Sequence, residues 1–203
     1  MLQGRGIFET SILFPRARVI AMPSRFIRAP HPKTEIKPSA EAIRKVLGLG
    51  WVAQLKIHGH RVQLHVPADA DEEIVAYNRQ GQRHKKLLSP AMEKEIRRLF
   101  TPSEGYNVVE GEWLKPKELI YFFDFLKKEG KPLDRLSFAE RWKLLPRAFI
   151  SPHLKTLPLI SKLEDCLGVL ADEKDDVEGL VFKSKSPGFA DTTIVRCWRA
   201  NLR

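Results

Sequence analysis

The segment Trp51-Val-Ala-Gln-Leu-Lys56-Ile-His-Gly59-His-Arg61-Val-Gln-Leu-His-Val66 places one lysine between two apolar, strand-like runs. A lysine acts as a nucleophile only when part of it is neutral, and burial beside apolar groups or other cations lowers a lysine pKa in that direction. Gly59 would let a phosphate-bearing ligand approach the backbone, and Arg61 could fork onto phosphate or sugar oxygens. Taken alone, the segment also fits a surface lysine whose ammonium lies in water.

The wider sequence strengthens the interpretation of this lysine. The pattern Lys56-x-His58-Gly59-x-Arg61 resembles the K-x-D-G-x-R motif of covalent nucleotidyltransferases, the superfamily of ATP-dependent DNA ligases, RNA ligases and messenger-RNA capping guanylyltransferases. Other stretches follow in that family's order: residues 77–81 are similar to S-R-x-G, residues 110–114 to D-G-E-L, residues 120–126 to the aromatic F-D-x-L strand, and residues 178–183 to E-G-x-V-x-K. Several matches in one order are harder to meet by chance than any single match. The resemblance covers the chain from about Trp51 to its C-terminus.

The resemblance implies a mixed α/β (α+β) fold, with two antiparallel β-sheets flanked by helices. We expect residues 1–37 to form a basic N-terminal arm or edge strands, and residues 38–203 to form a nucleotidyltransferase (adenylation) domain. The chain ends directly after the expected last motif, so no OB-fold domain is expected within it.

Local patterns predict several helices and strands within this fold. Ser39 is expected to cap a helix over residues 39–47, and Ser137 with Glu140 three residues later predicts a capping box on another helix. Further helices are expected over residues 87–99 and around residues 161–171. Short strands are expected over residues 17–22, 62–66 and 74–78, where the sequence alternates or is rich in β-branched side chains.

The charge balance favours a nucleic-acid partner. The sequence has 35 Lys and Arg residues against 25 Asp and Glu residues, for a formal net charge of +10. A surface with this excess attracts polyanions. A run such as residues 80–86, or the scattered Arg16, Arg18, Arg25 and Arg28, also fits an ordinary solvated surface.

Other compositional features exclude several classes of protein. The sequence has no long apolar run that could span a bilayer, and its start lacks the apolar core of a signal peptide. We therefore expect a soluble, intracellular (cytoplasmic) monomer of bacterial or viral type, with no membrane partner. Cys166 and Cys197 lack paired spacing, which argues against a zinc site or a disulfide framework. His58, His60 and His65 alternate on a strand-like stretch, but the sequence shows no converging partner for a metal site.

The resemblance assigns roles to individual residues around the nucleotide. Lys56 is the expected catalytic nucleophile, which attacks the α-phosphate of ATP and forms a lysyl-AMP. Glu112 is expected to hydrogen-bond the ribose hydroxyls. Phe123 is expected to stack on adenine, and Phe122 competes for that role because alternation along a strand lets only one of the two face the pocket.

The remaining nucleotide-binding residues surround these groups. Gln54 stands where the family presents an acid towards the adenine edge, and Ile57 is placed with it in the nucleotide pocket. Lys183 would add positive charge near the phosphates, although an isolated strand lysine is also typical of a solvent-facing position. Glu178 is the best candidate for a Mg²⁺ ligand, together with Glu112, and Mn²⁺ is an alternative ion.

Arginines and one histidine are expected to contact the nucleic acid. Arg79 is the candidate for the 5′-phosphate, and Arg61 for the ribose or the reacting 3′ end. His58 lies where DNA ligases carry an aspartate, and K-x-H-G is similar to the lysine motif of a phage and kinetoplastid branch of RNA ligases. In contrast, Arg61, the Arg79-x-Gly81 element and residues 123–141 look more like DNA ligases.

The last family motif, K-x-K, is expected within residues 194–199, where neither lysine is present. Arg196 and Arg199 would supply the positive charge there, although arginine and lysine do not bind phosphate in the same way.

Together these features predict an ATP-dependent polynucleotide ligase that joins 5′-phosphate and 3′-hydroxyl ends, with nicked duplex DNA as the first choice of substrate. The nearest alternative is an RNA ligase, or a ligase of mixed RNA and DNA substrates, that repairs strand breaks. A capping-type guanylyltransferase fits less well. An alternative of a different class is a non-catalytic nucleic-acid-binding module derived from a ligase.

Overall fold

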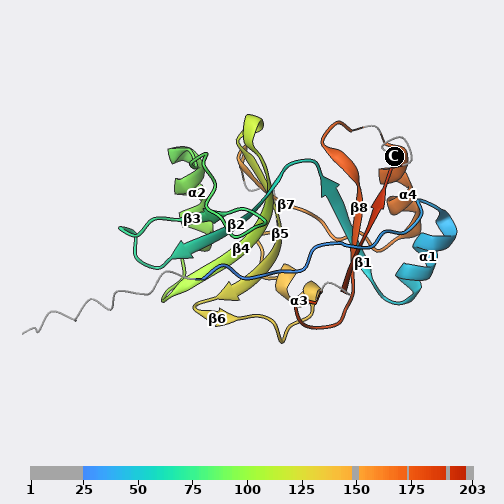
Figure 1. The fold of residues 1–203 in the computed structure, drawn as a ribbon, viewed down its shortest axis with the longest axis horizontal. Helices are drawn as coiled ribbons and strands as arrows, with labels where there is room; N and C mark the ends of the chain where they lie inside the picture. The colour runs from blue at the N-terminus through green and yellow to red at the C-terminus, as the bar shows by residue number, and fades with distance from the viewer. Residues whose placement is uncertain (1–24, 148–150, 173, 191–192, 200–203) are drawn as a thin grey trace, which may run out of the picture.

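The computed structural model describes residues 25–147, 151–172, 174–190 and 193–199, which form two β-sheets with helices packed beside them (Figure 1). The helices of this described part are α1 (Ala40–Gly48), α2 (Pro90–Phe100), α3 (Phe138–Trp142) and α4 (Leu163–Ala171), with a 3-10 turn η1 (Lys115–Lys117). The strands are β1 (Val52–Ile57), β2 (His60–Pro67), β3 (Val75–Tyr77), β4 (Tyr106–Leu114), β5 (Leu119–Lys128), β6 (Lys131–Pro132), β7 (Leu154–Thr156), β8 (Val177–Lys183) and β9 (Ile194–Trp198). The predicted mixed α/β class is confirmed.

The two sheets differ in size and are joined near the candidate lysine. The smaller sheet has the strand order β1-β8-β9, and the larger has the order β3-β2-β4-β5-β6, with β7 paired to β5. Pairing between the named strands is antiparallel, except that β7 runs parallel to β5. Only residues 58–59 separate β1 of the smaller sheet from β2 of the larger one, so Lys56 lies close to the point where the chain passes between sheets.

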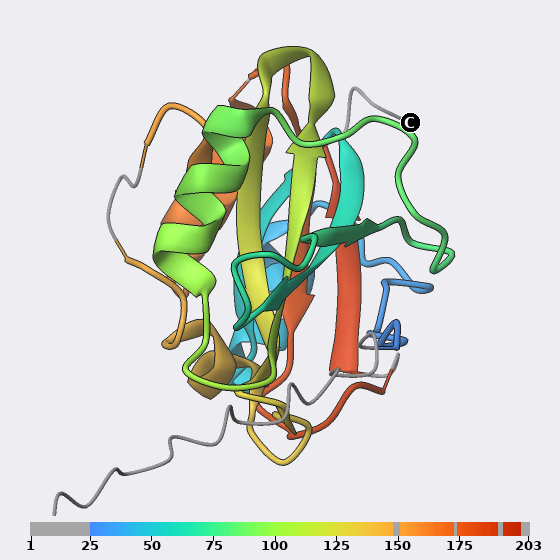
Figure 2. The same cartoon turned by 90° about the vertical axis from the view of Figure 1, so that its left-hand side faces the viewer.

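Each sheet has its own apolar core. In the larger sheet, Met92, Ile96 and Phe100 of α2 pack against buried residues of the central strands, which include Val62 and Phe122. Figure 2 shows α2 lying along the outer face of this sheet. In the smaller sheet, the buried core includes Ile43 of α1, Cys166 of α4, and Leu180, Phe182 and Cys197 of β8 and β9. Helices therefore cover the outer side of each sheet, which leaves the inner sides to face one another.

Local sequence signals placed most helix ends correctly. Ser39 caps α1 by accepting a hydrogen bond from the backbone N–H of Ala42, and Ser137 forms the predicted capping box with Glu140. The prediction for α2 began too early, because Ser89 provides the cap and Pro90 occupies the first turn. The helix after Ser137 is also shorter than its amphipathic pattern indicated and ends at Trp142.

Residues 25–36, which we call the connecting segment, run across both sheets without regular secondary structure (Figure 1, dark blue). Their bonds to the sheets join Ile27 to the Gln63 side chain, the carbonyl of Pro30 to Arg61, and Thr34 and Ile36 to the backbone of Arg196. The segment thus contacts β2 of the larger sheet and β9 of the smaller one. The predicted strand over residues 17–22 lies outside the described residues. Among the helices that the structure describes, none combines the length and apolar character that crossing a bilayer requires.

Candidate active site

A cavity of about 750 Å³ lies between the inner sides of the two sheets. Its lining comes from β1, β8 and β9 of the smaller sheet, from β2, β4 and β5 of the larger sheet, and from α3 and the connecting segment. Clefts of this size commonly bind small molecules or cofactors. Nearly all the residues proposed from sequence line it: Gln54, Lys56, Ile57, His58, Arg61, Arg79, Glu112, Phe123, Glu178, Lys183 and Arg196. Arg199 is the exception.

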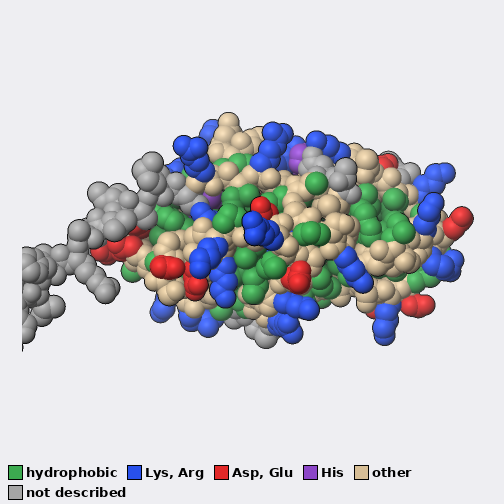
Figure 3. Space-filling model, turned by 90° about the horizontal axis from the view of Figure 1, so that it is seen from below, with side chains coloured by type: hydrophobic (Ala, Val, Ile, Leu, Met, Phe, Trp, Pro, Cys, Tyr) green, Lys and Arg blue, Asp and Glu red, His purple; other side chains and the backbone are tan. Residues whose placement is uncertain are grey.

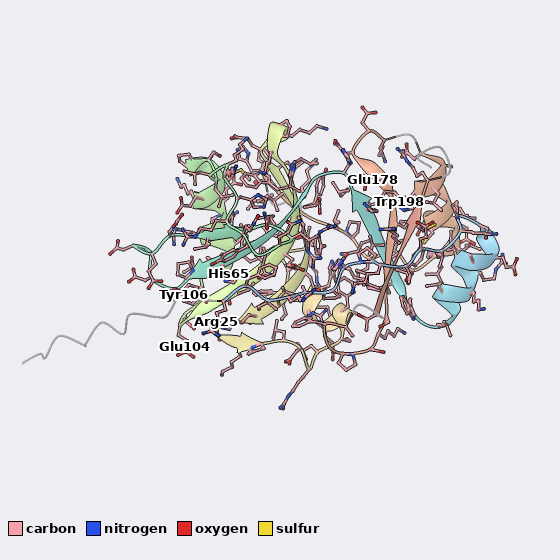
Figure 4. The ribbon with its side chains drawn as sticks, in the orientation of Figure 1. Arg25, His65, Glu104, Tyr106, Glu178 and Trp198 are labelled. Atoms are coloured by element: carbon pink, nitrogen blue, oxygen red, sulfur yellow. The ribbon has the colours of Figure 1, made fainter. Side chains whose placement is uncertain are left out.

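Lys56 reaches this cavity from β1 and is partly buried, with 21% of its side chain exposed. Its Nζ donates a hydrogen bond to Glu178 and lies 4.2 Å from the centre of the Trp198 ring. Figure 4 shows Glu178 and Trp198 close together on the smaller sheet. The lysine is therefore not a freely solvated surface residue, because a carboxylate and an aromatic face hold its nitrogen inside the cavity.

A β-bulge in β8 aligns Glu178 and Lys183 with the cavity. Regular alternation would put residues five apart on opposite faces of a strand. The register against β1 shifts here, because Lys56 pairs with Gly179 whereas Ile57 pairs with Val177. This irregularity leaves both Glu178 and Lys183 among the cavity-lining residues.

Gly179 is the residue that this bulge requires. Its φ of +149° lies in a region that side-chain-bearing residues rarely adopt, and a Cβ at this position would lie well inside 3.0 Å of the Cys197 carbonyl oxygen. Glycine thus permits the close approach of β8 and β9 directly beside Glu178.

Glu178 links Lys56 to His58. One carboxylate oxygen accepts from Lys56, and the other lies 2.5 Å from Nδ1 of His58. Burial raises the pKa of Glu178, but the hydrogen bonds from Lys56 and His58 outweigh it, so that the pKa lies below its ordinary value. His58 itself is 75% exposed. Its position at the cavity rim is compatible with contact to a large ligand outside the cavity.

Glu112 lies opposite, on β4 of the larger sheet. Burial raises the pKa of Glu112 to about 7, although the positive charges of Lys56 and Arg61 oppose this shift. Gly59 makes room for this side chain, because a Cβ on residue 59 would lie 2.9 Å from Cγ of Glu112. In this structure the glycine of the lysine motif therefore lets the link between β1 and β2 pack closely against β4.

The alternation of β5 distinguishes the two candidate aromatic residues. Phe122 is fully buried in the core of the larger sheet, where its ring packs against Phe100. Phe123 faces the other way and lines the cavity. Of the two, only Phe123 presents its side chain to a ligand in the cavity.

Lys183 and Gln54 form a buried polar pair at the inner end of the cavity. The Nζ of Lys183 donates to Oε1 of Gln54 at 3.0 Å, and Nε2 of Gln54 donates to the Leu157 carbonyl. The ammonium of Lys183 also lies between the rings of Phe123 and Phe138. Burial lowers the pKa of Lys183 to about 8. The solvent-facing alternative for Lys183 is wrong, because the residue is only 8% exposed.

Arg61 is held by protein groups in this structure. Its guanidinium makes a two-pronged ion pair with Glu110, and a third nitrogen donates to the Pro30 carbonyl. Burial lowers the pKa of Arg61, but the charge and hydrogen bonds of Glu110 more than offset this, which leaves the pKa raised. Arg61 thereby anchors the connecting segment to β2 while it lines the cavity.

The three remaining arginines occupy different environments. Arg79 is exposed in the turn after β3, at the cavity edge. Arg196 lines the cavity from β9, where it contacts Trp198 and Glu35. Arg199 is buried outside the cavity lining and donates to the Asp172 carbonyl. An odd spacing along an extended chain explains why Arg196 and Arg199 do not face the same side.

The sequence-based prediction gave no role to Trp198, Asp124 or Arg141, which also line the cavity. Trp198 lies over Lys56, and Asp124 forms a buried, two-pronged ion pair with Arg141 of α3. Both members of that pair line the cavity. The even spacing of Trp198 from Arg196 would have indicated a shared face of β9. No comparable local signal links Asp124 to Arg141.

The donor set at Lys56 suits a divalent cation. Glu112 and Glu178 both line the cavity and interact electrostatically with Lys56 and with one another. A carboxylate whose pKa is raised by burial, as that of Glu112 is, gains from a nearby cation. The described residues contain no group of three or more His, Cys, Asp or Glu side chains that could hold a metal. An ion such as Mg²⁺ often takes one or two carboxylates and completes its shell with water and phosphate oxygens, so Glu112 and Glu178 are the residues that would hold it.

The fold of the two sheets and their helices is similar to that of the adenylation domain of ATP-dependent DNA ligases. One similar solved structure is a mycobacterial DNA ligase D complexed with ATP and MES, with a TM-score of 0.57 and 15% sequence identity over 84% of this chain. Another, named Pmar-Lig_PreS3, has a TM-score of 0.51 and 13% identity over 81% of this chain. The ligase domain of LigD from M. tuberculosis matches 72% of this chain, with 16% identity and a TM-score of 0.47.

The similarities to DNA ligase D and to Pmar-Lig_PreS3 establish the fold, which confirms the fold class expected from the motifs. The chain spans roughly half the length of the structures that it matches, with 60% of the first, 54% of the M. tuberculosis ligase domain and 46% of Pmar-Lig_PreS3 covered. No protein-family model matches the sequence, and no curated protein matches it.

Proposed function

We propose that this protein is an ATP-dependent polynucleotide ligase that joins 5′-phosphate and 3′-hydroxyl ends through a lysyl-AMP on Lys56. The observation that carries the proposal is the convergence of Lys56, Glu112, Glu178 and Phe123 on one cavity from both sheets. These side chains come from four of the motifs that resemble the nucleotidyltransferase family. A surface lysine on an unrelated sheet would not require carboxylates from two different sheets beside it.

The first step would transfer AMP to the protein. The Nζ of Lys56 attacks the α-phosphorus of ATP, a nitrogen–phosphorus bond forms, the bond from that phosphorus to the bridging oxygen breaks, and pyrophosphate leaves. Lys56 must first lose a proton and its ion pair with Glu178. A Mg²⁺ ion held by Glu178 and Glu112 would compete with Lys56 for the carboxylate and supply positive charge at the triphosphate.

The rest of the cavity would bind and orient the nucleotide. Phe123 offers its ring to the adenine, and Glu112 lies on the same inner face for the ribose hydroxyls. Lys183 and Arg196 place positive charge on the smaller sheet. Phosphoryl transfer gains mainly from such positioning and from stabilisation of charge on the phosphate oxygens, because the protein itself contributes little covalent chemistry after the first attack.

Two further transfers would complete the reaction. A 5′-phosphate oxygen of the nucleic acid attacks the AMP phosphorus, which releases Lys56 and leaves an adenylated strand end. A 3′-hydroxyl then attacks the phosphorus of the original 5′-phosphate, AMP leaves, and a phosphodiester forms. Arg79 and His58 lie at the cavity edge and rim, where they can contact a polymer too large to enter.

The first test is formation of the covalent nucleotide. Incubating the protein with ATP labelled at the α-phosphate, or with labelled GTP, in the presence of Mg²⁺ should give a labelled protein band from ATP. The bond should resist alkali and break in acid, as a phosphoramidate does. Lys56→Arg keeps the charge but should give no band. The exposed Lys94→Arg on α2 is the matched control and should label like the natural protein. Labelling that persists in Lys56→Arg would refute the assignment of the nucleophile.

Nicked duplex DNA is the proposed substrate, and one feature favours RNA as the second candidate. His58 replaces the aspartate of DNA ligases, and its contact with Glu178 gives the motif a different charge near the reacting lysine. A panel of nicked duplexes with DNA or RNA on either side of the break decides between them. Faster sealing of a DNA 3′-hydroxyl supports the first candidate, and faster sealing of an RNA 3′-hydroxyl supports the second. A protein that binds these duplexes but never forms the AMP adduct would instead be a non-catalytic binding module.

A further inference from the structure

A second hollow of about 500 Å³ lies beside the candidate active site. Phe26, Arg28 and His31 of the connecting segment line one side, and Asn78, Arg79 and Gln80 of the turn after β3 line the other. Arg61, Arg79 and His31 belong to the lining of both hollows, so the second opens next to the first. A bound polymer could therefore pass from one into the other.

Both walls of the second hollow are held in place by the fold. On one side, the ring of Phe26 packs over Gly81, where a Cβ would lie 2.9 Å from the ring, and both backbone polar groups of Ile27 bond to Gln63. On the other side, Oδ1 of Asn78 accepts from the backbone N–H groups of Gln80 and Gln82. The backbones that carry Arg28 and Arg79 are thus fixed relative to β2.

Among the residues that the structure describes, the two arginines on these walls have no acidic partner. Both are exposed, and neither forms a hydrogen bond or ion pair with another residue in the part of the chain that the structure describes. The acidic residue of this lining is Glu110, whose oxygens are already engaged by Arg61 and Gln63. The hollow therefore carries positive charge that no acidic side chain in the described part of the chain neutralises.

Position distinguishes these arginines from the general positive charge of the protein. Figure 3 shows Lys and Arg side chains spread along the whole of one face, among fewer acidic side chains. Such scattered charge attracts any polyanion without fixing its register. Two exposed arginines that line the same hollow can instead donate forked hydrogen bonds to a phosphate group bound there.

We propose that Arg28 and Arg79 form a subsite for a backbone phosphate of the nucleic-acid strand whose end reaches Lys56. The inference rests on the proposed ligase function, and it assigns a substrate-binding role to the connecting segment. The hollow is too small for a duplex but falls within the range of roughly 300–1,000 Å³ typical of small-ligand sites, which suits a nucleotide or its phosphate. The strand would lie along the second hollow and present its terminus to the first.

The test compares two arginines of the same segment. Arg28→Ala is the probing variant, and Arg25→Ala is its matched control, because Arg25 is also exposed but lines neither hollow. Figure 4 shows Arg25 beside the larger sheet, well away from Glu178 in this view. Binding of a fluorescein-labelled nicked DNA duplex is followed by anisotropy over a series of KCl concentrations. Formation of the AMP adduct is measured separately on each variant without nucleic acid.

We expect Arg28→Ala to weaken binding roughly five- to tenfold at low salt and to reduce the slope of log K against log salt by about 0.7–0.9, the contribution of one phosphate contact. Arg28→Lys should restore the slope but only part of the affinity, because it keeps the charge and loses the fork. Arg25→Ala should stay within about twofold of the natural protein. In the background of Arg79→Ala, the effect of Arg28→Ala should be smaller, because the two residues would share one phosphate.

Three results would overturn the subsite. One is an Arg28→Ala variant that binds DNA like Arg25→Ala. Another is a loss of AMP-adduct formation in Arg28→Ala that is as large as its loss of DNA binding, which would mean that Arg28 contacts ATP in the first cavity. The last is that polyglutamate displaces the labelled duplex and that Arg28→Ala weakens polyglutamate binding as much as it weakens DNA binding, which would indicate an acidic protein partner. If the natural protein forms no AMP adduct but Arg28 still governs DNA binding, the ligase function fails and the phosphate contact stands.

Discussion

The Nζ of Lys56 lies 4.2 Å from the centre of the Trp198 ring, and the two residues lie on strands that both pair with Gly179 of β8. The ring covers one side of the nitrogen, and Glu178 holds another. Trp198 is held in turn by a hydrogen bond from its Nε1 to Glu35. The direction from which Lys56 can reach a phosphorus atom is therefore set by β8 and β9 together.

Removing the Trp198 ring should slow transfer of AMP to Lys56. The ring covers one side of the nitrogen and restricts the directions in which it can point, so Trp198→Ala should reduce the rate of adduct formation by about tenfold or more through loss of positioning. Trp198→Phe keeps an aromatic face and should stay within about threefold. The measurement is single-turnover labelling with ATP. Equal rates for Trp198→Ala and the natural protein would contradict a positioning role.

The neighbouring phenylalanines of β5 should have opposite effects. Phe122→Ala should lower the free energy of unfolding by about 3–5 kcal/mol, because the ring is fully buried in the core. Phe123→Ala should cost much less stability but should raise the KM for ATP in adduct formation, because it removes the ring offered to the adenine. Urea unfolding and ATP titration on both variants give the comparison. A Phe123→Ala protein with unchanged KM would mean that the base stacks elsewhere.

Gly179 should tolerate no side chain. In Gly179→Ala the new Cβ would collide with the Cys197 carbonyl at a positive φ, and we expect a loss of about 3 kcal/mol or more in the free energy of unfolding. Gly168→Ala is the matched control, because a Cβ there meets nothing within 4 Å and the residue lies inside α4. It should stabilise the protein by about 0.5–1 kcal/mol. Similar changes in the free energy of unfolding for Gly179→Ala and Gly168→Ala would show that the backbone at the bulge can shift to accommodate a side chain at little cost.

Lys183 should make stability depend on alkaline pH. Burial lowers the pKa of Lys183 from 10.5 to about 8, so between these values the folded state binds fewer protons at this site than the unfolded state. The cost of burying the charged Lys183 is therefore fully present below pH 8, and stability rises as pH increases from 8 to 10.5 because the folded state loses this proton first. We compare the free energy of unfolding of Lys183→Met with that of the natural protein at each pH. The value for the variant minus the value for the natural protein should fall by about 2–3 kcal/mol between pH 7 and 10.

The control for this measurement is the exposed Lys185→Met, whose difference from the natural protein should stay flat over the same range. Loss of the hydrogen bond from Lys183 to Gln54 adds an offset that does not change with pH in this window. The test is whether the difference in free energy of unfolding between Lys183→Met and the natural protein changes with pH. If this difference is constant from pH 7 to 10, Lys183 is not a buried group that titrates in this range.

Features that depend on neighbouring residues could be predicted from the sequence. The caps at Ser39 and Ser137 are local, because each serine bonds to a backbone N–H three residues later. The alternation of β5 could be predicted too, and it reduced the choice between Phe122 and Phe123 to one of two faces. Which of the two faces points into the cavity depends on the pairing of β5 with β4 and on the position of α2. The local sequence around Phe122 and Phe123 contains neither piece of information.

Features that depend on distant pairing could not be predicted. Arg61 has the expected position in the cavity, but its pairing with Glu110 arises from the β2–β4 register across 49 residues. The bulge at Gly179 brings Glu178 and Lys183 to one side against the simple alternation rule. Both outcomes follow from strand register, which a motif does not contain. Arg199 is a different case, because its odd spacing from Arg196 already indicated that the two side chains lie on different sides, although motif order grouped them.

The connecting segment has a consequence for the width of the active cavity. Its bonds to Arg61 on β2 and to the backbone of Arg196 on β9 tie the two walls together with one stretch of extended chain. Because residues 25–36 stay attached at both walls, they limit how far the two sheets can separate. A strand end that enters the cavity would thus meet walls of set spacing, with Arg28 held beside them.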